Sequence, residues 1–333
     1  MQVLTIDDSS IWDNFIDKSP YGAIFHKWGF LKIIEKHTGY TLLPYGMCVK
    51  DRLVCVFPVF LKTNYGVNVI LSPPPRTGVP YMGFVMSKEY DTLTQNGKEI
   101  RMREIVQGIT GKLDEFSPIY VSIQVIPSFI DIREFKWNDY SIELLFTYYL
   151  PTEASLEGIL KGFSRSTRNV IKKIIENKFN IEMRKSNDVL PFYEILSKRY
   201  EEQGIRFPII SIEYLEDLLR LYPQNINLYY VYDEEDNIIG SSLAVIYNGK
   251  VISWLGTPKP DVDLPVNDLI FWELIKISKD RNCVFEIGGA DTRRLCSFKS
   301  RFNPSIETNY RVFKRRNIGA LAEWVYLNVY KRK

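Results

Sequence analysis

Histidine and cysteine are scarce in this chain of 333 residues. There are 2 His and 4 Cys, and no two of the cysteines have C-x-x-C spacing. Structural zinc sites are built from clustered cysteine and histidine ligands, so we expect no metal site. Three of the cysteines lie within or beside apolar, strand-like runs, which is typical of buried free thiols. The four are Cys48, Cys55, Cys283 and Cys296.

Long apolar runs are also missing. None approaches the roughly 20 residues that a membrane-spanning helix needs. The first ten residues, M-Q-V-L-T-I-D-D-S-S, lack the basic and apolar regions of a secretory signal. We therefore expect a cytoplasmic protein without a transmembrane segment. The net charge of +3 is too small to require a nucleic-acid partner.

The composition is that of a folded globular protein, with 45% hydrophobic and 25% charged residues. The length favours two domains, each large enough to bury its own core. We expect an α/β (α+β) fold with mixed central sheets. The predicted domains are residues 1–150 and 151–315, and the basic amphipathic tail 316–333 is expected to pack as a helix on the first. Binding of that tail to a membrane surface is the alternative.

The most informative stretch runs from Ile238 to Phe302. Two alternating β-branched runs flank Asn248-Gly249, a strong hairpin signal. An amphipathic helix then precedes the strand C-V-F-E-I-G-G, which must lie parallel to the strand before the helix. A basic, aromatic segment, L-C-S-F-K-S-R-F, is expected to cross the open end of this sheet. The first half of the chain shows the same order of elements, which suggests two copies of one fold.

A basic segment lies between Lys161 and Lys185. Arg165, Arg168 and Lys172 are spaced by three and four residues and share one helix face. Such a stripe suits a phosphate-bearing partner, such as tRNA or a nucleotide-linked substrate. It is equally typical of a solvated charged helix, and charge alone does not decide between the two.

A helix from Lys27 to His37 carries Trp28 with Lys32 one turn later. The tryptophan is typical of a core anchor, and the lysine of a solvated surface residue. Both are also candidates for substrate binding.

Four segments in order resemble the FemABX-like branch of the GNAT superfamily, which includes aminoacyl-tRNA-dependent peptidyltransferases. The first is F-H-K-W-G-F-L-K, similar to that family's Trp-containing first helix. The second is the basic L-K-G-F-S-R-S-T-R-N-V-I-K-K, and the third the helix P-V-N-D-L-I-F-W-E-L-I-K. The fourth is F-E-I-G-G-A-D followed by F-K-S-R-F, similar to a "D-x-G-G … F-K-x-x-F" ending. Together they span nearly the whole chain.

The resemblance implies two tandem GNAT-like domains and attack by a substrate amine on an activated acyl ester or thioester. Lys299, the lysine of the F-K motif, is then the catalytic residue that stabilises the acyl carbonyl. Its flanking phenylalanines favour a partly dry site, where a cation stabilises an oxyanion better than in water. The remaining expected substrate-binding residues are Trp28, Lys32, Arg168, Arg206, Trp254, Asn267 and Asp291.

The expected product is an amide on a cell-envelope or sugar-nucleotide amine, and a small-molecule or nucleotide-linked amine is the expected partner. The donor stays open between acyl-CoA and aminoacyl-tRNA. No Q/R-x-x-G-x-G/A pyrophosphate loop occurs; the nearest approach, N-I-I-G-S-S, lacks the second glycine. No histidine base is evident, so Asp291 or Glu286 is a candidate proton acceptor. The alternative is a non-catalytic binding protein of the same fold for an anionic ligand or RNA.

Overall fold

The computed structural model describes residues 2–127, 129, 131–202, 204, 210–259 and 262–316. The chain divides into two compact units. Unit 1 comprises the segments up to Leu145 and from Thr308 on, and unit 2 comprises Phe146–Glu307. The domain limits drawn from the sequence stay a prediction. The expected C-terminal helix lies outside the described residues from residue 317 on.

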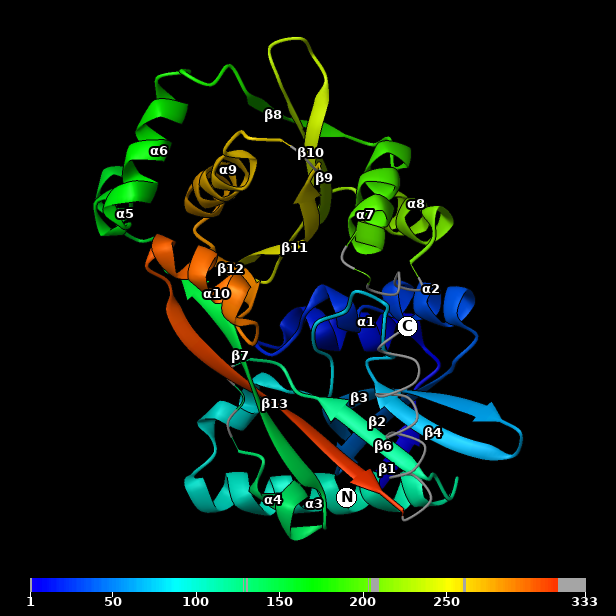
Figure 1. Ribbon diagram of the computed structural model, residues 1–333. Coiled ribbons are helices and arrows are strands. Elements are labelled where there is room, and N and C mark those ends of the chain that lie inside the picture. Colours follow the sequence, from blue (N-terminus) through cyan, green and yellow to red (C-terminus); the bar gives the residue numbers. More distant parts are fainter. Residues whose placement is uncertain are drawn as a thin grey trace. The chain divides into compact units, whose positions relative to one another are not determined.

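Unit 1 is built on a mixed sheet with the strand order β1-β2-β3-β4-β6-β13, and β5 pairs with β3 (Figure 1). The β4–β6 pair is parallel, whereas the other pairs are antiparallel. The strands are β1 Gln2–Thr5, β2 Thr41–Val49, β3 Arg52–Asn64, β4 Val67–Ser72, β5 Val85–Met86, β6 Tyr120–Gln124 and β13 Ser305–Arg315. The helices are α1 Ser9–Lys18, η1 Ile24–His26, α2 Trp28–Thr38, η2 Lys88–Thr92, α3 Gln95–Asp114 and α4 Arg133–Trp137.

The helix ends of unit 1 follow local chemistry. The Asp8 side chain accepts hydrogen bonds from two backbone N–H groups at the start of α1, and Thr94 does the same for one at the start of α3. Gly39 ends α2 in the left-handed conformation. The helix α2 buries Phe30, Leu31, Ile33 and Ile34, so the helix predicted for this segment is confirmed.

Unit 2 is built on strands in the order β7-β12-β11-β10-β9-β8, with parallel and antiparallel pairs. The predicted hairpin forms β10 and β11, and the predicted parallel pair is β11 with β12, joined by α9. The strands are β7 Ser141–Leu150, β8 Glu182–Ser186, β9 Ile226–Tyr232, β10 Ile238–Tyr247, β11 Lys250–Pro258 and β12 Val284–Gly289. The helices are α5 Leu156–Gly162, α6 Arg165–Ile175, α7 Leu190–Glu202, α8 Ile212–Leu221, α9 Val266–Asp280, α10 Arg293–Lys299 and η3 Ser300–Phe302.

Helices cover both faces of the unit 2 sheet (Figure 1). Val231 of β9 belongs to the core cluster shared with α5, α6 and α9. Its neighbour Tyr230 points to the other face, where its hydroxyl accepts the backbone N–H of Phe192 in α7. The basic, aromatic segment after β12 forms the short helices α10 and η3. Their place at the carboxyl end of β12 brings Lys299 to the candidate site.

The four cysteines are free, but fewer are buried than expected. Cys55 and Cys283 are buried, whereas Cys48 and Cys296 are partly exposed. Cys48 lies next to the turn that ends β2, and Cys296 lies on α10. Within the described residues, no helix is both long and apolar enough to cross a membrane. Those residues also include no group of three or more metal-ligating side chains placed to hold an ion.

Candidate active site

The strands β11 and β12 separate at the centre of unit 2. Their parallel pairing extends from Lys250 with Val284 to Ile252 with Glu286. Beyond that point β11 stays paired with β10, and β12 stays paired with β7. Parallel strands that part at their carboxyl ends open a crevice, which is a common position for ligand sites in α/β sheets.

Two β-bulges lie beside this separation. One falls between β10 and β11, where Trp254 is the additional residue. The other falls between β12 and β7 and leaves Ile287 without a partner in the register. Bulges redirect side chains and are frequent next to active sites. Trp254 is buried, so this predicted cleft residue packs within the domain at the point where the strands part.

Lys299 is the last residue of α10 and reaches back to the end of β12. Its Nζ donates to the carbonyl oxygen of Gly289 at 2.9 Å and to that of Gly288 at 3.1 Å. The φ angle of Gly288 is 82°, a conformation that favours glycine. These carbonyls are neutral, so the ammonium group is held in place while no ion pair with a described residue cancels its charge.

Burial lowers the pKa of Lys299 to about 8, and nearby Cys296, Glu286 and Asp291 oppose part of this effect. A lysine normally titrates near 10.5, because water stabilises its charged form. Here the ammonium form is partly desolvated. Strongly perturbed pKa values of this kind, caused by burial in a specific environment, are typical of functional sites.

Aromatic rings surround the base of α10. The ring centroids of Phe298 and Phe302 lie 5.6 Å apart, and Phe271 of α9 lies 5.4 Å and 5.2 Å from them. Phe302 is fully buried and also packs on Phe163 at 5.2 Å. The two phenylalanines that flank Lys299 in sequence thus belong to one aromatic cluster at the base of α10.

A buried polar cluster follows the same strands. Lys250 Nζ donates to the hydroxyl oxygen of Tyr149 at 2.7 Å, and Thr147 Oγ1 donates to Glu286 Oε1 at 3.4 Å. Burial lowers the pKa of both Lys250 and Lys299, and the carboxylate of Glu286, which is 2% exposed, opposes part of this effect. Lys250 and Tyr149 had no signal in the sequence, because only the strand register brings them next to Glu286.

Cys296, expected from the sequence only as a free thiol, is a further residue near Lys299. Its Sγ donates to the carbonyl oxygen of Ala290 at 3.1 Å, one turn of α10 before Lys299. Burial, followed by the hydrogen bond with Cys296, raises the pKa of Tyr148. The spacing of three residues between Cys296 and Lys299 could have shown that they share a helix face.

Two other predicted site residues of unit 2 are Asp291, which follows β12, and Asn267, at the start of α9. The Asp291 Oδ1 atom accepts the backbone N–H of Phe146 at 3.1 Å and so supports β7. It is exposed, and it lies close enough to Lys299 to influence that pKa. Asn267 is the second residue of α9 and is partly exposed.

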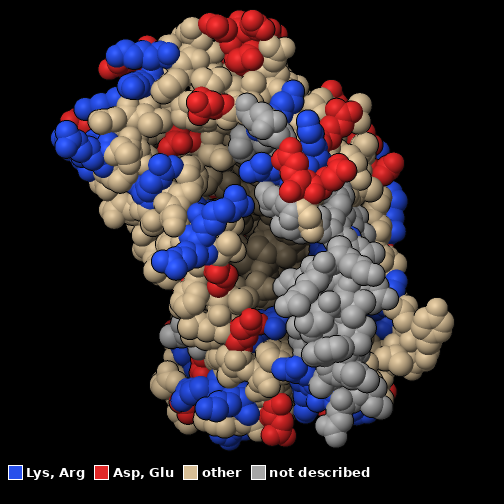
Figure 2. All heavy atoms as spheres, in the orientation of Figure 1, with Lys and Arg blue, Asp and Glu red and all other residues tan. Residues whose placement is uncertain are grey.

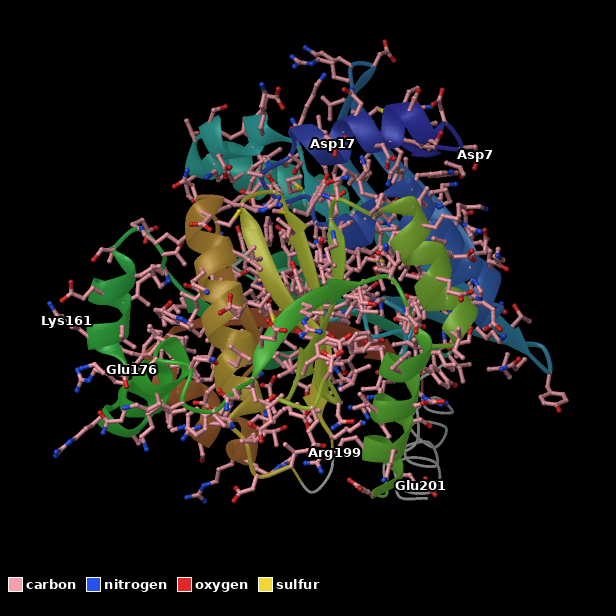
Figure 3. All side chains as sticks on the ribbon, turned by 90° about the horizontal axis from the view of Figure 1, so that it is seen from above. Asp7, Asp17, Lys161, Glu176, Arg199 and Glu201 are labelled. Atoms are coloured by element: carbon pink, nitrogen blue, oxygen red, sulfur yellow. The ribbon has the colours of Figure 1, made fainter. Side chains whose placement is uncertain are left out.

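Arg168 has local contacts of its own. Its Nη1 donates to the carbonyl oxygen of Lys161 at 3.0 Å, which ties α6 to the end of α5. Arg165, Lys172 and Lys173 are exposed, and Figure 2 shows basic side chains gathered over these two helices. Lys161 points outward from α5 (Figure 3) and pairs with Glu157 at 2.8 Å. The predicted basic stripe is therefore present on the surface.

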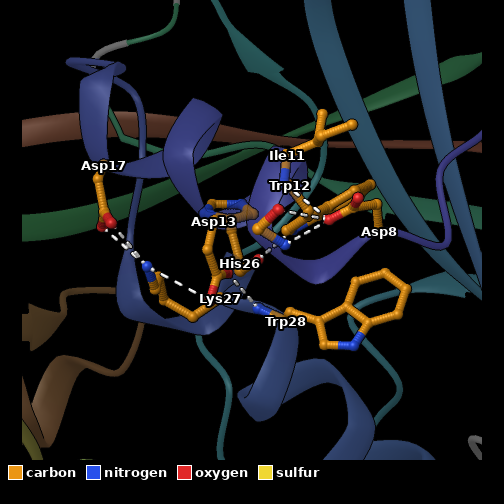
Figure 4. Close-up of polar contacts among 9 residues, drawn as sticks. Asp8, Ile11, Trp12, Asp13, Asp17, His26, Lys27 and Trp28 are labelled. Carbon is orange, nitrogen blue, oxygen red and sulfur yellow. Dashed lines mark hydrogen bonds and ion pairs between the residues drawn. The ribbon is translucent and has the colours of Figure 1, made fainter.

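In unit 1, Trp28 and Lys32 are brought together on α2. The Lys32 Nζ lies 6.0 Å from the Trp28 ring centroid and also pairs with Glu35. Trp28 is partly exposed and packs edge-on against the fully buried Trp12 at 6.0 Å, so Trp12 is the core anchor. The backbone N–H of Trp28 donates to Asp13 Oδ1 at 2.7 Å (Figure 4).

The histidine His26 has a structural role. It is fully buried, and burial lowers its pKa to about 4. Its Nδ1 accepts the backbone N–H of Ala23 at 3.0 Å, so Nε2 carries the proton and donates to the carbonyl oxygen of Met82 at 3.0 Å. Both ring nitrogens are therefore used in holding the fold.

Arg206 lies outside the described residues. The N-I-I-G-S-S segment, the nearest approach to a pyrophosphate loop, belongs to the end of a turn and to strand β10. Its Gly240 and Ser241 pair with both neighbouring strands, so this segment is not a loop open to a ligand.

The class of protein follows from comparison with known families. Residues 161–300 match the family model of the acetyltransferase (GNAT) domain. The matched region runs from the end of α5 to the residue after Lys299, and it includes both bulges and the parallel pair of strands. Residues 161–300 thus match a GNAT domain, and the predicted resemblance to the GNAT superfamily is confirmed.

The particular fold is that of the tandem members. FemX is similar over 99% of this chain and 100% of its own, with a TM-score of 0.71 and 12% identity. L-PGS from Bacillus licheniformis is similar over the full length of both chains, with a TM-score of 0.59 and 11% identity. A tandem GNAT protein from the clavulanic acid biosynthesis pathway is similar over 93% of this chain and 98% of its own, with a TM-score of 0.50 and 6% identity. No curated protein sequence matches the chain. The predicted fold class is confirmed.

Proposed function

We propose that this chain is an acyltransferase that moves an acyl or aminoacyl group onto an amine and so forms an amide. The acceptor we propose is an amine of a cell-envelope or sugar-nucleotide type substrate. The observation that carries the proposal is Lys299, a half-buried ammonium group held by two neutral carbonyls where two parallel strands part. The GNAT domain and the FemX-like fold support the same reaction class.

The proposed reaction balances as follows. The nitrogen of the acceptor forms a bond to the acyl carbon, and the carbonyl oxygen becomes negatively charged. The Lys299 ammonium group stabilises that charge, more effectively than in water because the site is partly dry. The C–O bond of an ester donor or the C–S bond of a thioester donor then breaks. The proton lost by the amine passes to the leaving group, through Asp291 or Glu286 or through water.

The other candidate residues have binding roles in this proposal. Lys32, beside Trp28, binds anionic groups of the substrates together with Arg168 and Arg206. Trp254, Asn267 and Asp291 form the wall of the cleft. Lys250 and Tyr149 are positioning residues, because they act on Glu286 and through it on the charge of Lys299. An exchange of Lys250 for methionine should move the pH profile of transfer rather than abolish it.

The donor is either aminoacyl-tRNA or acyl-CoA, and a binding experiment separates them. Each donor, as a non-hydrolysable amide analogue, is added to the full chain and the unfolding midpoint is measured. A donor that binds the native state raises the midpoint, because it stabilises the folded chain by RT ln(1 + L/Kd), where L is the donor concentration. Stabilisation by one donor and transfer of its acyl group to an amine would support the proposal. A midpoint unchanged by either donor would contradict it.

The basic surface of α6 favours one alternative, a protein that binds RNA without catalysis. Arg165, Lys172 and Lys173 are exposed there. This alternative predicts that the chain binds tRNA without an aminoacyl group and catalyses no acyl transfer. The logarithm of the binding constant should fall linearly with the logarithm of the salt concentration, with a slope of about 0.7 per phosphate contact. Salt-insensitive binding would exclude it.

A further inference from the structure

Unit 1 contains a cavity of about 480 Å³ that the proposed reaction does not use. It is lined by side chains from the segment after α1, from η2, from the first turn of α3 and from the segment before α4. Its aromatic and charged lining residues include Tyr21, Tyr90, Asp91, Lys98, Phe129 and Arg133. The volume is in the range of small-molecule sites.

Three aromatic rings form one wall of the cavity. The Tyr21 ring centroid lies 6.3 Å from that of Tyr90 and 5.7 Å from that of Phe129, both in edge-on geometry. Tyr90 and Phe129 lie 5.9 Å apart. Edge-on contacts of this kind hold the rings in fixed orientations and form a preorganised apolar surface.

Most of the polar groups in the cavity already have partners. Both oxygens of Asp131 accept from Arg133, whose Nε and Nη2 lie 2.9 Å and 3.1 Å away. Arg133 Nη2 also donates to Glu99 Oε1 at 2.9 Å, and Gln95 donates to the same oxygen at 3.0 Å. These three charged groups bond to one another, but two carboxylates share one guanidinium, so the network keeps a net negative charge.

Two side chains of opposite charge, Lys98 and Asp91, line the cavity outside this network. Among the described residues, Lys98 has no hydrogen-bond or ion-pair partner, and its Nζ lies over the Tyr90 ring, 5.4 Å from the centroid. Asp91 accepts a hydrogen bond from the neutral hydroxyl of Tyr21 but pairs with no cation in the described part of the chain. Lys98 and Asp91 do not pair with each other, although they line the same cavity.

From this arrangement we propose that the cavity binds a free α-amino acid with an aromatic or large apolar side chain. The Lys98 ammonium group binds the carboxylate, Asp91 binds the ammonium group, and the side chain packs against Tyr21, Tyr90 and Phe129. Such a ligand carries both charges a short distance apart, and its apolar part matches the aromatic wall. The burial that raises the pKa of Tyr90 to about 12 keeps its hydroxyl protonated, as a further donor to the carboxylate.

The test uses three related probes and calorimetric titration of the full chain. L-phenylalanine carries both charges, phenethylamine lacks the carboxylate, and 3-phenylpropanoate lacks the ammonium group. We expect L-phenylalanine to bind about tenfold or more tightly than either truncated probe, because each missing group loses a charge-assisted contact.

Two variants assign the contacts. With Lys98→Gln, we expect L-phenylalanine to bind no more tightly than phenethylamine, whose own affinity stays unchanged. With Asp91→Asn, which keeps an acceptor for the Tyr21 hydroxyl, L-phenylalanine should bind no more tightly than 3-phenylpropanoate. Lys112→Gln is the matched control, since Lys112 lies on the same helix α3 but pairs with Glu115 instead.

The proposal is overturned if L-phenylalanine shows no saturable binding at millimolar concentration. It is also overturned if phenethylamine binds wild-type protein as tightly as L-phenylalanine, or if Lys98→Gln leaves the affinity for L-phenylalanine unchanged. The unfolding midpoint of each variant shows that it is folded. Because the readout is binding and not acyl transfer, its failure leaves the proposed function untouched.

Discussion

Two lysines, one in each unit, are removed from water to a large extent, but their partners differ. In unit 1, the Lys27 side chain is 13% exposed and its Nζ lies 2.8 Å from Asp17 and 3.5 Å from Asp13 (Figure 4). In unit 2, Lys299 is held by the carbonyl oxygens of Gly288 and Gly289.

This difference in partners decides whether the charge of a half-buried lysine is available to a substrate. A carboxylate that pairs with a lysine neutralises its charge. The lysine can then no longer stabilise charge on a third group, and the pair mainly holds the fold. Neutral carbonyl dipoles orient the ammonium group but leave its charge available to a third group. Lys299 has that second arrangement, and this is why we assign it to the acyl carbonyl and give Lys27 a structural role.

The largest effect is expected from replacing each lysine with methionine. Lys299→Met should lower kcat for acyl transfer by about 10²–10³-fold, the usual cost of losing one oxyanion contact. Lys27→Met should leave kcat unchanged and lower the free energy of unfolding by roughly 1–3 kcal/mol, because Asp13 and Asp17 lose their cation. Single-turnover assays and chemical denaturation of both variants measure the two effects.

Lys276→Met serves as the control within unit 2, since Lys276 pairs with Glu273 on the surface of α9. It should behave as wild type in both measurements. Equal kcat values for wild type and Lys299→Met would refute the catalytic assignment. A loss of kcat in Lys27→Met as large as that in Lys299→Met would refute the contrast between the two lysines.

The pH dependence sharpens the same contrast with a smaller effect. The proposed role needs Lys299 protonated, and burial lowers its pKa to about 8. Transfer should therefore fall as the pH rises above 8, by about tenfold per unit once the group is neutral. Lys299→Arg stays charged in this range, so whatever activity it retains should not show this decline. A wild-type profile that is flat to pH 10 would contradict the assignment.

The same pKa has a consequence for stability. Between pH 8 and 10.5 the unfolded chain keeps the lysine proton while the folded chain has released it, so unfolding takes up a proton. The free energy of unfolding should then rise with pH across this window, and the rise should be absent in Lys299→Met. Below pH 8 the lysine is charged in both states and its unfavourable burial stays constant.

Much of the fold could be predicted from the sequence because its signals are local. The Asn248-Gly249 turn, where both residues have positive φ, fixed the β10–β11 hairpin, and the apolar spacing of α9 fixed the crossover. Lys299 was marked by the resemblance of its F-K-S-R-F segment to a family motif, and its two flanking phenylalanines agreed with that role. These features depend on neighbouring residues, which a sequence shows directly.

The rest of the site depends on contacts between distant residues. The bulge at Trp254, the pairing of Lys250 with Tyr149 and the glycine carbonyls that hold Lys299 all result from strand register. A shift of one residue in the register would turn these side chains to the opposite face. The Trp28 prediction shows the same limit, since only packing could decide that Trp12 is the buried anchor.

A smaller effect is expected from replacing glycines with positive φ. It tests whether the carbonyl groups of Gly288 and Gly289 position Lys299. Gly288→Ala and Gly249→Ala should each lower the free energy of unfolding by about 1–2 kcal/mol, because both positions have left-handed backbone. Only Gly288→Ala displaces a carbonyl that holds Lys299, so it alone should lower kcat and shift the pH midpoint of transfer. Gly249 lies in a turn with open space around it, which makes it the matched control. If both variants keep the wild-type pH midpoint, the carbonyls do not position Lys299. The contrast that we draw between Lys299 and Lys27 would then not hold.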